Sequence, residues 1–276
     1  MQGAYINVEK GSVSNFTLES AEGYPYASGV AACMTSMDNQ PMYVEQGGWY
    51  NDNATSKTAL QRGFYAAPVQ PSSPSVRLVG VSGSTEGPGA AFASMACSPD
   101  GQLYLFGGLS ISGHTPEFNK NLNMTIHMPM WEPQALLFGA KLGGSSSAPS
   151  ISRATKLAAG VKGAAAPGAR SGHVLTYLRA GTVSQLGLQS DALLLYGGSD
   201  VNTTSLGDVL LNETDAAKVL NASEWDTTAW LYDIAADRWR KLVPVGDLPP
   251  GLMYHSIAVE DKQVSRSWST RSRSET

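Results

Sequence analysis

The sequence predicts an all-β fold built from repeated units. An apolar run of strand-forming residues ends in two consecutive glycines at three places, as PMYVEQGG, QLYLFGG and LLLYGG. Paired glycines end a strand where backbones approach closely or where φ becomes positive. The three pairs are Gly47 and Gly48, Gly107 and Gly108, and Gly197 and Gly198. One such pair indicates a turn, whereas three of them indicate a repeat.

The residues around the third pair extend this unit in both directions. Upstream, PGARSGHVLTYL predicts a turn that contains Arg170 and His173, followed by a strand. Downstream, WLYDIAADRWRKL predicts a strand, a turn and then Trp239. The order of Pro, Arg and Gly-His, then apolar-Gly-Gly, then Tyr-Asp and Trp resembles the kelch motif.

The resemblance implies a kelch-type β-propeller, in which each unit is a four-stranded blade that buries both apolar faces against neighbouring blades. It implies that each glycine pair follows the second strand of its blade. It also implies that Trp239 joins two blades, so we expect it to pack against the strand that starts near His255 or against Tyr196. A β-sandwich with unrelated glycines is the alternative fold.

The other copies match the motif less completely. The second copy keeps the first strand, a hairpin signal at Asp100 and Gly101, the glycine pair and a tryptophan, Trp131. The first copy lacks a tryptophan at the expected place. Half units flank the three copies, and the second of these places His255 at the position of His173. The predicted motifs cover residues 5–18, 25–80, 88–137, 167–243 and 249–259. They represent about four blades, an incomplete or open propeller relative to the roughly six or seven usual in the family.

The spacing of the glycine pairs indicates insertions. Gly107 follows Gly47 by 60 residues and Gly197 follows Gly107 by 90, whereas kelch units have about 50 residues. The segment from Gly139 to Ala169 is rich in Gly, Ser, Ala and Pro, so we expect a mobile loop there. A further insertion spans Asn202 to Ala229. Long loops on rigid blades are the usual place for binding functions. The Ser/Arg-rich tail, 261–276, is expected to be disordered.

Composition limits the possible partners. The chain has 276 residues, of which 42% are apolar, enough for the core of one large β domain. Its net charge of −4 argues against a nucleic-acid-binding surface. No run of 18 apolar residues occurs, so no membrane span is expected within the chain. The expected partners are a protein or glycan ligand, together with further blades of a longer protein or a second copy of the chain.

Asparagine placement indicates the compartment. Six of the eleven asparagines lie in Asn-X-Ser/Thr, namely Asn15, Asn53, Asn123, Asn202, Asn212 and Asn221. Chance would give roughly two such sites. We therefore expect an extracellular or secretory-pathway protein, alone or as part of a membrane protein, with a cytoplasmic location as the alternative.

The two cysteines leave their pairing open. Cys33 lies 14 residues before Gly47, whereas Cys97 lies 10 residues before Gly107. An offset of four strand residues corresponds to roughly 13 Å, which exceeds the reach of a disulfide. The offset favours two separate buried thiols, and a disulfide is the alternative.

No catalytic motif is recognised in the sequence. The four histidines have no metal-ligand spacing, and no P-loop, dinucleotide fingerprint or nucleophile elbow is found. The propeller resemblance also extends to galactose oxidase-like copper-radical enzymes, but Cys97 and Tyr104 do not reproduce their linked cysteine–tyrosine pair. We therefore expect no enzyme activity, no cofactor and no metal site. The leading hypothesis is a non-catalytic binding module that acts through its inter-strand loops, and the alternatives are an intracellular kelch adaptor and a copper-radical oxidase.

Overall fold

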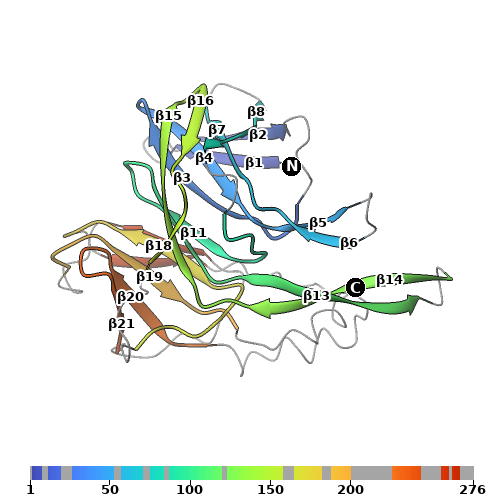
Figure 1. The fold of residues 1–276 in the computed structure, drawn as a ribbon. Coiled ribbons are helices and arrows are strands. Elements are labelled where there is room, and N and C mark those ends of the chain that lie inside the picture. The colour runs from blue at the N-terminus through green and yellow to red at the C-terminus, as the bar shows by residue number, and fades with distance from the viewer. Residues whose placement is uncertain are drawn as a thin grey trace, which may run out of the picture.

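A computed structural model of the chain describes twelve segments, and every regular element in them is a β-strand (Figure 1). The segments are residues 2–7, 12–19, 27–52, 57–70, 75–83, 87–119, 123–157, 165–181, 188–199, 226–243, 256–260 and 263–267. The predicted all-β class is therefore confirmed for these residues.

Three sheets contain the same succession of four antiparallel strands, and we call them the first, second and third repeat units. The first unit consists of β3 (Ala31–Met37), β4 (Gln40–Gln46), β7 (Phe64–Pro68) and β9 (Val79–Gly80). The second consists of β11 (Ser94–Cys97), β12 (Gln102–Phe106), β15 (Leu137–Ser145) and β17 (Thr155–Leu157). The third consists of β18 (Val174–Leu178), β19 (Ala192–Tyr196), β20 (Ala229–Asp233) and β21 (Arg238–Lys241).

Shorter pieces complete the strand pairing. β16 (Ala148–Ile151) extends the second unit and pairs in parallel with β10 (Ser82–Gly83). β1 (Gln2–Asn7), β2 (Ser12–Glu19) and β8 (Ser75–Arg77) form a separate sheet. β22 (Ser256–Glu260) and β23 (Gln263–Ser267) form a hairpin. This hairpin includes residues 263–267 of the tail that the sequence predicts to be disordered.

Each glycine pair follows the second strand of a different unit, as the sequence predicts. All six glycines have φ between 66° and 86°, a region that other residues rarely adopt. The space around them is equally restrictive. A Cβ on Gly107 would lie 2.6 Å from the Arg170 carbonyl oxygen of the third unit, and one on Gly108 would lie 2.7 Å from the Ala91 carbonyl of its own unit.

Backbone hydrogen bonds join equivalent positions of successive units. The amide of Phe92 donates to the Gly29 carbonyl at 2.7 Å, and the amide of Gly172 donates to the Phe92 carbonyl at 3.1 Å. These three residues each lie two positions before the first strand of their unit. The first strands also follow one another in space, because β11 lies beside β3, β18 beside β11 and β22 beside β18. Equivalent strands of successive units thus lie side by side in space.

Apolar side chains fill the junctions between units because alternate residues of a strand point to opposite faces of its sheet. In β12, Leu103 and Leu105 belong to the core that the second unit shares with the first. Tyr104 and Phe106, the residues between and after them, belong to the core that it shares with the third. The run from Leu103 to Phe106 therefore lacks polar alternation, because both of its faces are buried.

Trp239 is buried, as predicted, but it faces the opposite neighbour. Its ring lies 5.4 Å from that of Phe106 in the preceding unit and 5.2 Å from that of Tyr232 in its own. The expected contact with Tyr196 is wrong, because Tyr196 does not belong to this core. The alternative contact cannot be compared at His255, which lies outside the described residues. Trp239 has this orientation because the register pairs it with Tyr232, whose side chain points to the second unit.

The predicted mobile loop is wrong for residues 139–157, which form most of β15 together with β16 and β17. The small residues reflect close packing. A Cβ on Gly139 would lie 2.7 Å from Leu157 Cδ1, and Ala140 is buried in the shared core. The third strand of the second unit begins at Leu137, the residue at which the sequence places the end of the second motif.

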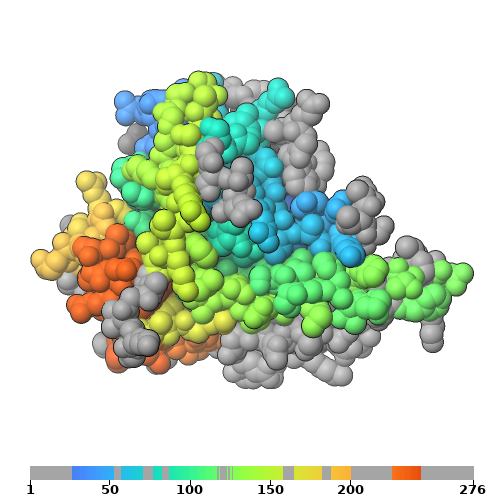
Figure 2. Space-filling view, in the orientation of Figure 1, coloured from blue at the N-terminus to red at the C-terminus, as the bar shows by residue number. Residues whose placement is uncertain are grey.

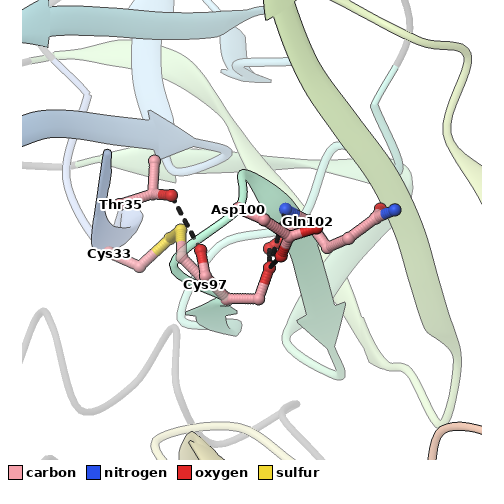
Figure 3. Close-up of a disulfide and its surroundings, with 6 residues drawn as sticks. Cys33, Thr35, Cys97, Asp100 and Gln102 are labelled. Carbon is pink, nitrogen blue, oxygen red and sulfur yellow. Dashed lines mark hydrogen bonds between the residues drawn. A yellow bond between two sulfur atoms is a disulfide. The ribbon is translucent and has the colours of Figure 1, made fainter. Parts of the chain in front are cut away.

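Cys33 and Cys97 form a disulfide between the first strands of the first and second units (Figure 3). Their Cα atoms are 5.8 Å apart, so the expectation of separate thiols is wrong. Counting from the glycine pair crosses a hairpin whose length differs between the units. Ser28 and Ala91 are equivalent residues, because each forms an isolated antiparallel bridge shortly before the first strand of its unit. Cys33 lies five positions after Ser28 and Cys97 lies six positions after Ala91, so the two cysteines are nearly in register. Thr35 reinforces the junction by donating its hydroxyl to the Ser98 carbonyl at 2.7 Å.

Candidate binding platform

The connection between the second and third strands begins and ends at the same place in all three units. The carbonyl of the second glycine accepts a hydrogen bond from the residue three positions before the third strand. The donors are Gln61 to Gly48 at 2.9 Å, Gln134 to Gly108 at 2.9 Å and Asp226 to Gly198 at 3.0 Å. Each bond closes the base of an excursion, of residues 49–60, 109–133 and 199–225 respectively. The base is constant, whereas the length and sequence of the excursion vary.

The first two excursions form one sheet, which we call the platform. β5 (Trp49–Asp52) and β6 (Lys57–Leu60) form a hairpin, as do β13 (Leu109–Asn119) and β14 (Met124–Pro133). β14 pairs in parallel with β6, which gives the strand order β13-β14-β6-β5. The β13–β14 hairpin extends well away from the repeat units (Figures 1 and 2). Most of the third excursion lies outside the described residues.

Aromatic packing anchors the base of the platform. The rings of Trp49 and Trp131 meet edge to face with centroids 6.5 Å apart, and both pack around the buried side chains of Ala91 and Leu109. Further out, His114 Nε2 lies 2.9 Å from the Thr58 carbonyl oxygen and ties β13 to the neighbouring hairpin. Trp131 is thus not the counterpart of Trp239 that the sequence suggested, because it belongs to the excursion and not to the fourth strand of its unit.

The register gives the distal hairpin two different faces. Met130 is opposite Gly113 and Met128 is opposite Thr115, so these four residues share one face, which we call the methionine face. His114, Pro116 and Phe118 alternate with that set and share the other face. Met130 is 51% exposed and Phe118 is 57% exposed, which makes them two of the four exposed large apolar side chains in the described part of the chain.

A partly buried ion pair stabilises the base of the third excursion. Arg170 donates from Nη1 to the Gly197 carbonyl at 3.1 Å, and its Nη2 lies 2.6 Å from Asp226 Oδ2. Burial raises the pKa of Asp226, but hydrogen bonds from Thr228 and the charge of Arg170 outweigh burial and lower it. Arg170 and His173 are both buried, and His173 packs edge to face on Phe106. Both predicted repeat residues therefore make structural contacts, Arg170 within the third unit and His173 with Phe106 of the second.

An open groove of about 530 Å³ lies between the second and third units, at the other end of the strands. Tyr104 and Tyr232 are buried beneath it, and Lys141 and Asp237 stand at its rim. Lys141 forms an ion pair with Asp100 at 2.8 Å, and the Tyr232 hydroxyl donates to Asp237. Arg153 also lines the groove, so charged side chains of both signs surround it.

The remaining predicted site residues fall in several places. Among the described residues, no group of three or more His, Cys, Asp or Glu side chains could hold a metal ion. Asn123 lies exposed at the tip of the β13–β14 hairpin, and Asn15 lies in β2. The other four predicted glycosylation sites, Asn53, Asn202, Asn212 and Asn221, lie outside the described residues. The described part of the chain also contains no helix that could cross a membrane.

No family model matches the chain, and no curated protein matches it. Two solved structures are similar to it at 14% identity. "Structure of YjhT" has a TM-score of 0.47, with 93% of this chain and 69% of the other covered. "Cryo-EM structure of RAG in complex with one melted RSS and one unmelted RSS" has a TM-score of 0.49, with 89% of this chain and 59% of the other covered. Because both TM-scores are below 0.5, neither likeness supports a statement about fold or function.

Proposed function

We propose that this chain is an arc of a kelch-type β-propeller and that it binds a protein partner through the methionine face of the platform. Propellers repeat a four-stranded sheet around an axis. Three observations support this arrangement: the shared strand order of the units, the backbone bonds between equivalent positions, and the succession of β3, β11, β18 and β22.

The observation that carries the binding proposal is the fusion of two excursions into one sheet. The bonds to Gly48 and Gly108 fix the bases of both hairpins, and the β14–β6 pairing joins them. A surface built this way is held rigidly by the repeat units, while its sequence is free to vary. An exposed methionine suits such a surface, because its flexible, polarizable side chain adapts to a partner. Met130 therefore lies at the centre of the proposed contact.

The proposed compartment is extracellular or the lumen of the secretory pathway. The disulfide between Cys33 and Cys97 supports it, because disulfides persist mainly in oxidising environments. The six Asn-X-Ser/Thr sites support it as well. The intracellular adaptor is the competing proposal, and a glycosidase-induced shift in electrophoretic mobility of the protein from its native host separates the two.

The proposed function is non-catalytic. A copper-radical oxidase would need a cysteine linked to a tyrosine, whereas Cys97 is bonded to Cys33. Arg170 binds the Gly168 and Gly197 carbonyls and Asp226, all within the chain. We therefore assign neither Cys97 nor the Arg170–Asp226 pair to a substrate.

Binding by the methionine face is tested with a matched pair of substitutions. Met130→Glu places a charge on the platform, and Met34→Glu places the same charge on β3, where Met34 is 46% exposed. Immobilised wild-type and variant chains are exposed to secreted and cell-surface proteins of the native host, and each retained protein is quantified. A true partner is retained by the wild type and by Met34→Glu, and its affinity falls at least about tenfold with Met130→Glu. Equal retention by both variants would overturn the proposal.

A further inference from the structure

Asn123 occupies an unusually accessible position for a modification site. It begins an Asn-Met-Thr sequence at the tip of the distal hairpin, one residue before β14. Its side chain is exposed, and its φ of 48° lies in the left-handed region that asparagine tolerates better than most residues. Among the six candidate asparagines it is the one whose side-chain exposure the structure describes.

An exposed aromatic residue lies beside this sequence across the hairpin. Thr125, the third residue of the Asn-Met-Thr sequence, is directly opposite Phe118 in the β13–β14 register. Directly opposed residues share a face, and their Cβ atoms are about 5 Å apart. Phe118 is 57% exposed, although an aromatic ring of this size is normally covered. The ring therefore offers an apolar surface beside the Asn-Met-Thr sequence.

We infer that Asn123 carries an N-linked glycan and that the ring of Phe118 is the seat of its first sugar. The inference rests on the secretory compartment of the proposed function. In the modification, Asn123 Nδ2 forms a bond to C1 of N-acetylglucosamine in a lipid-diphosphate-linked oligosaccharide. The bond from C1 to the lipid-diphosphate oxygen breaks, the amide loses one proton, and the lipid diphosphate leaves. Thr125 supplies the hydroxyl residue that the acceptor sequence requires.

Such a glycan has a physical consequence for the hairpin. The apolar face of the sugar ring removes area of Phe118 from water, which the exposed ring otherwise leaves uncovered. β13 is also an edge strand of the platform over eleven residues, and a bulky polar group at its tip hinders pairing with another chain. Because Phe118 and Met130 lie on opposite faces, the glycan leaves the methionine face open.

The test uses the full chain, secreted from eukaryotic cells behind a cleavable signal peptide and recovered from the medium. Glycopeptide mass spectrometry measures occupancy at Asn123 in the wild type, in Phe118→Ser and in Met130→Ser. Met130→Ser is the matched control, because it removes a similarly exposed apolar side chain from the other face of the same hairpin. The expected result is a glycan at Asn123 in the wild type and in Met130→Ser, with lower occupancy in Phe118→Ser.

A second measurement tests the contact itself. If the sugar lies on the ring, the N-acetyl protons of the first N-acetylglucosamine show an aromatic ring-current shift in the wild type that Phe118→Ser abolishes. An unmodified Asn123 in secreted, disulfide-bonded protein overturns the site. Equal occupancy and equal proton shifts in the wild type and Phe118→Ser overturn the role of the ring. Neither readout needs a binding partner, so a negative result here is distinguishable from a negative result in the retention experiment on Met130.

Discussion

Arg170 and Asp226 form an ion pair of 2.6 Å that locks the third glycine pair to the returning chain. The same guanidinium donates to the Gly197 carbonyl, and the amide of Asp226 donates to the Gly198 carbonyl. One buried cation thus connects the start of the unit, the end of its second strand and the residue that leads into its third. In the first and second units glutamine occupies the position of Asp226, and no arginine occupies that of Arg170.

Replacement of Arg170 by alanine should destabilise the chain by about 3 kcal/mol. This value is the lower end of the range for breaking a buried pair, because Asp226 keeps partial access to water. Urea denaturation followed by tryptophan fluorescence measures the change. A loss below about 1 kcal/mol would mean that the pair does not hold the base of the excursion.

Replacement of Asp226 by asparagine should alter the dependence of stability on pH. The folded-state pKa of Asp226 lies below its ordinary value of 3.8, so the carboxylate stabilises the fold above that pH and the stabilisation is lost as pH falls through the folded pKa. The free energy of unfolding of the wild type should therefore exceed that of Asp226→Asn most above about pH 5, and this difference should shrink toward about pH 3. The pKa values of Asp100 and Asp233 are also lowered, but their contributions are common to both proteins and cancel. A difference that stays constant over this range would contradict the assignment.

The Cys33–Cys97 disulfide should contribute up to about 4 kcal/mol to the free energy of unfolding. This is the value expected from chain entropy for cysteines separated by 64 residues. Replacing both cysteines by serine should lower stability by somewhat less, because the bond from Thr35 to the Ser98 carbonyl still holds the same strands. Urea melts with and without a reductant measure the effect. The double variant is the control, since reductant should leave it unchanged. A wild type that is also insensitive to complete reduction would show that the bond adds nothing.

Replacement of Gly107 by alanine should lower the free energy of unfolding by about 1 kcal/mol because of the positive φ. The contact with the Arg170 carbonyl should lower it by about 1 to 3 kcal/mol more. Gly181→Ala is the matched control. Gly181 has φ of 78°, but a Cβ there would have no neighbour within 4 Å. The two variants therefore separate backbone strain from steric contact. Equal losses in thermal or urea denaturation would mean that the approach of the two units at Gly107 is not restrictive.

Replacement of Trp239 by alanine should cost about 3 to 5 kcal/mol, the usual range for a buried aromatic residue. Its contacts with Phe106 and Tyr232 predict that the second and third units lose stability together. Hydrogen exchange of the amides of β12 and β20 measures this coupling. Faster exchange confined to the third unit would contradict the packing across the junction.

Local sequence was sufficient to locate the repeat, because a glycine pair at positive φ depends on backbone sterics that few other residues satisfy. It therefore placed three second strands correctly and predicted the burial of Trp239. It also singled out Arg170 and His173 as repeat residues, and the structure buries both. It failed where a residue's meaning depends on its neighbour in space. Gly139 and Ala140 suggest a mobile segment by composition, yet they are small because Leu157 and the shared core lie against them.

The pairing of Cys33 with Cys97 and the assembly of the platform were decided by tertiary structure alone. Whether two cysteines meet depends on how the first strands β3 and β11 lie together, and the count of residues along the chain crosses hairpins of unequal length. The platform depends on the pairing of β14 with β6, whose register involves segments about 70 residues apart. The sequence alone therefore determined the three second strands and their repeat, because these follow from local backbone and side-chain preferences. The contacts between units were determined only when folding brought distant segments to the same place.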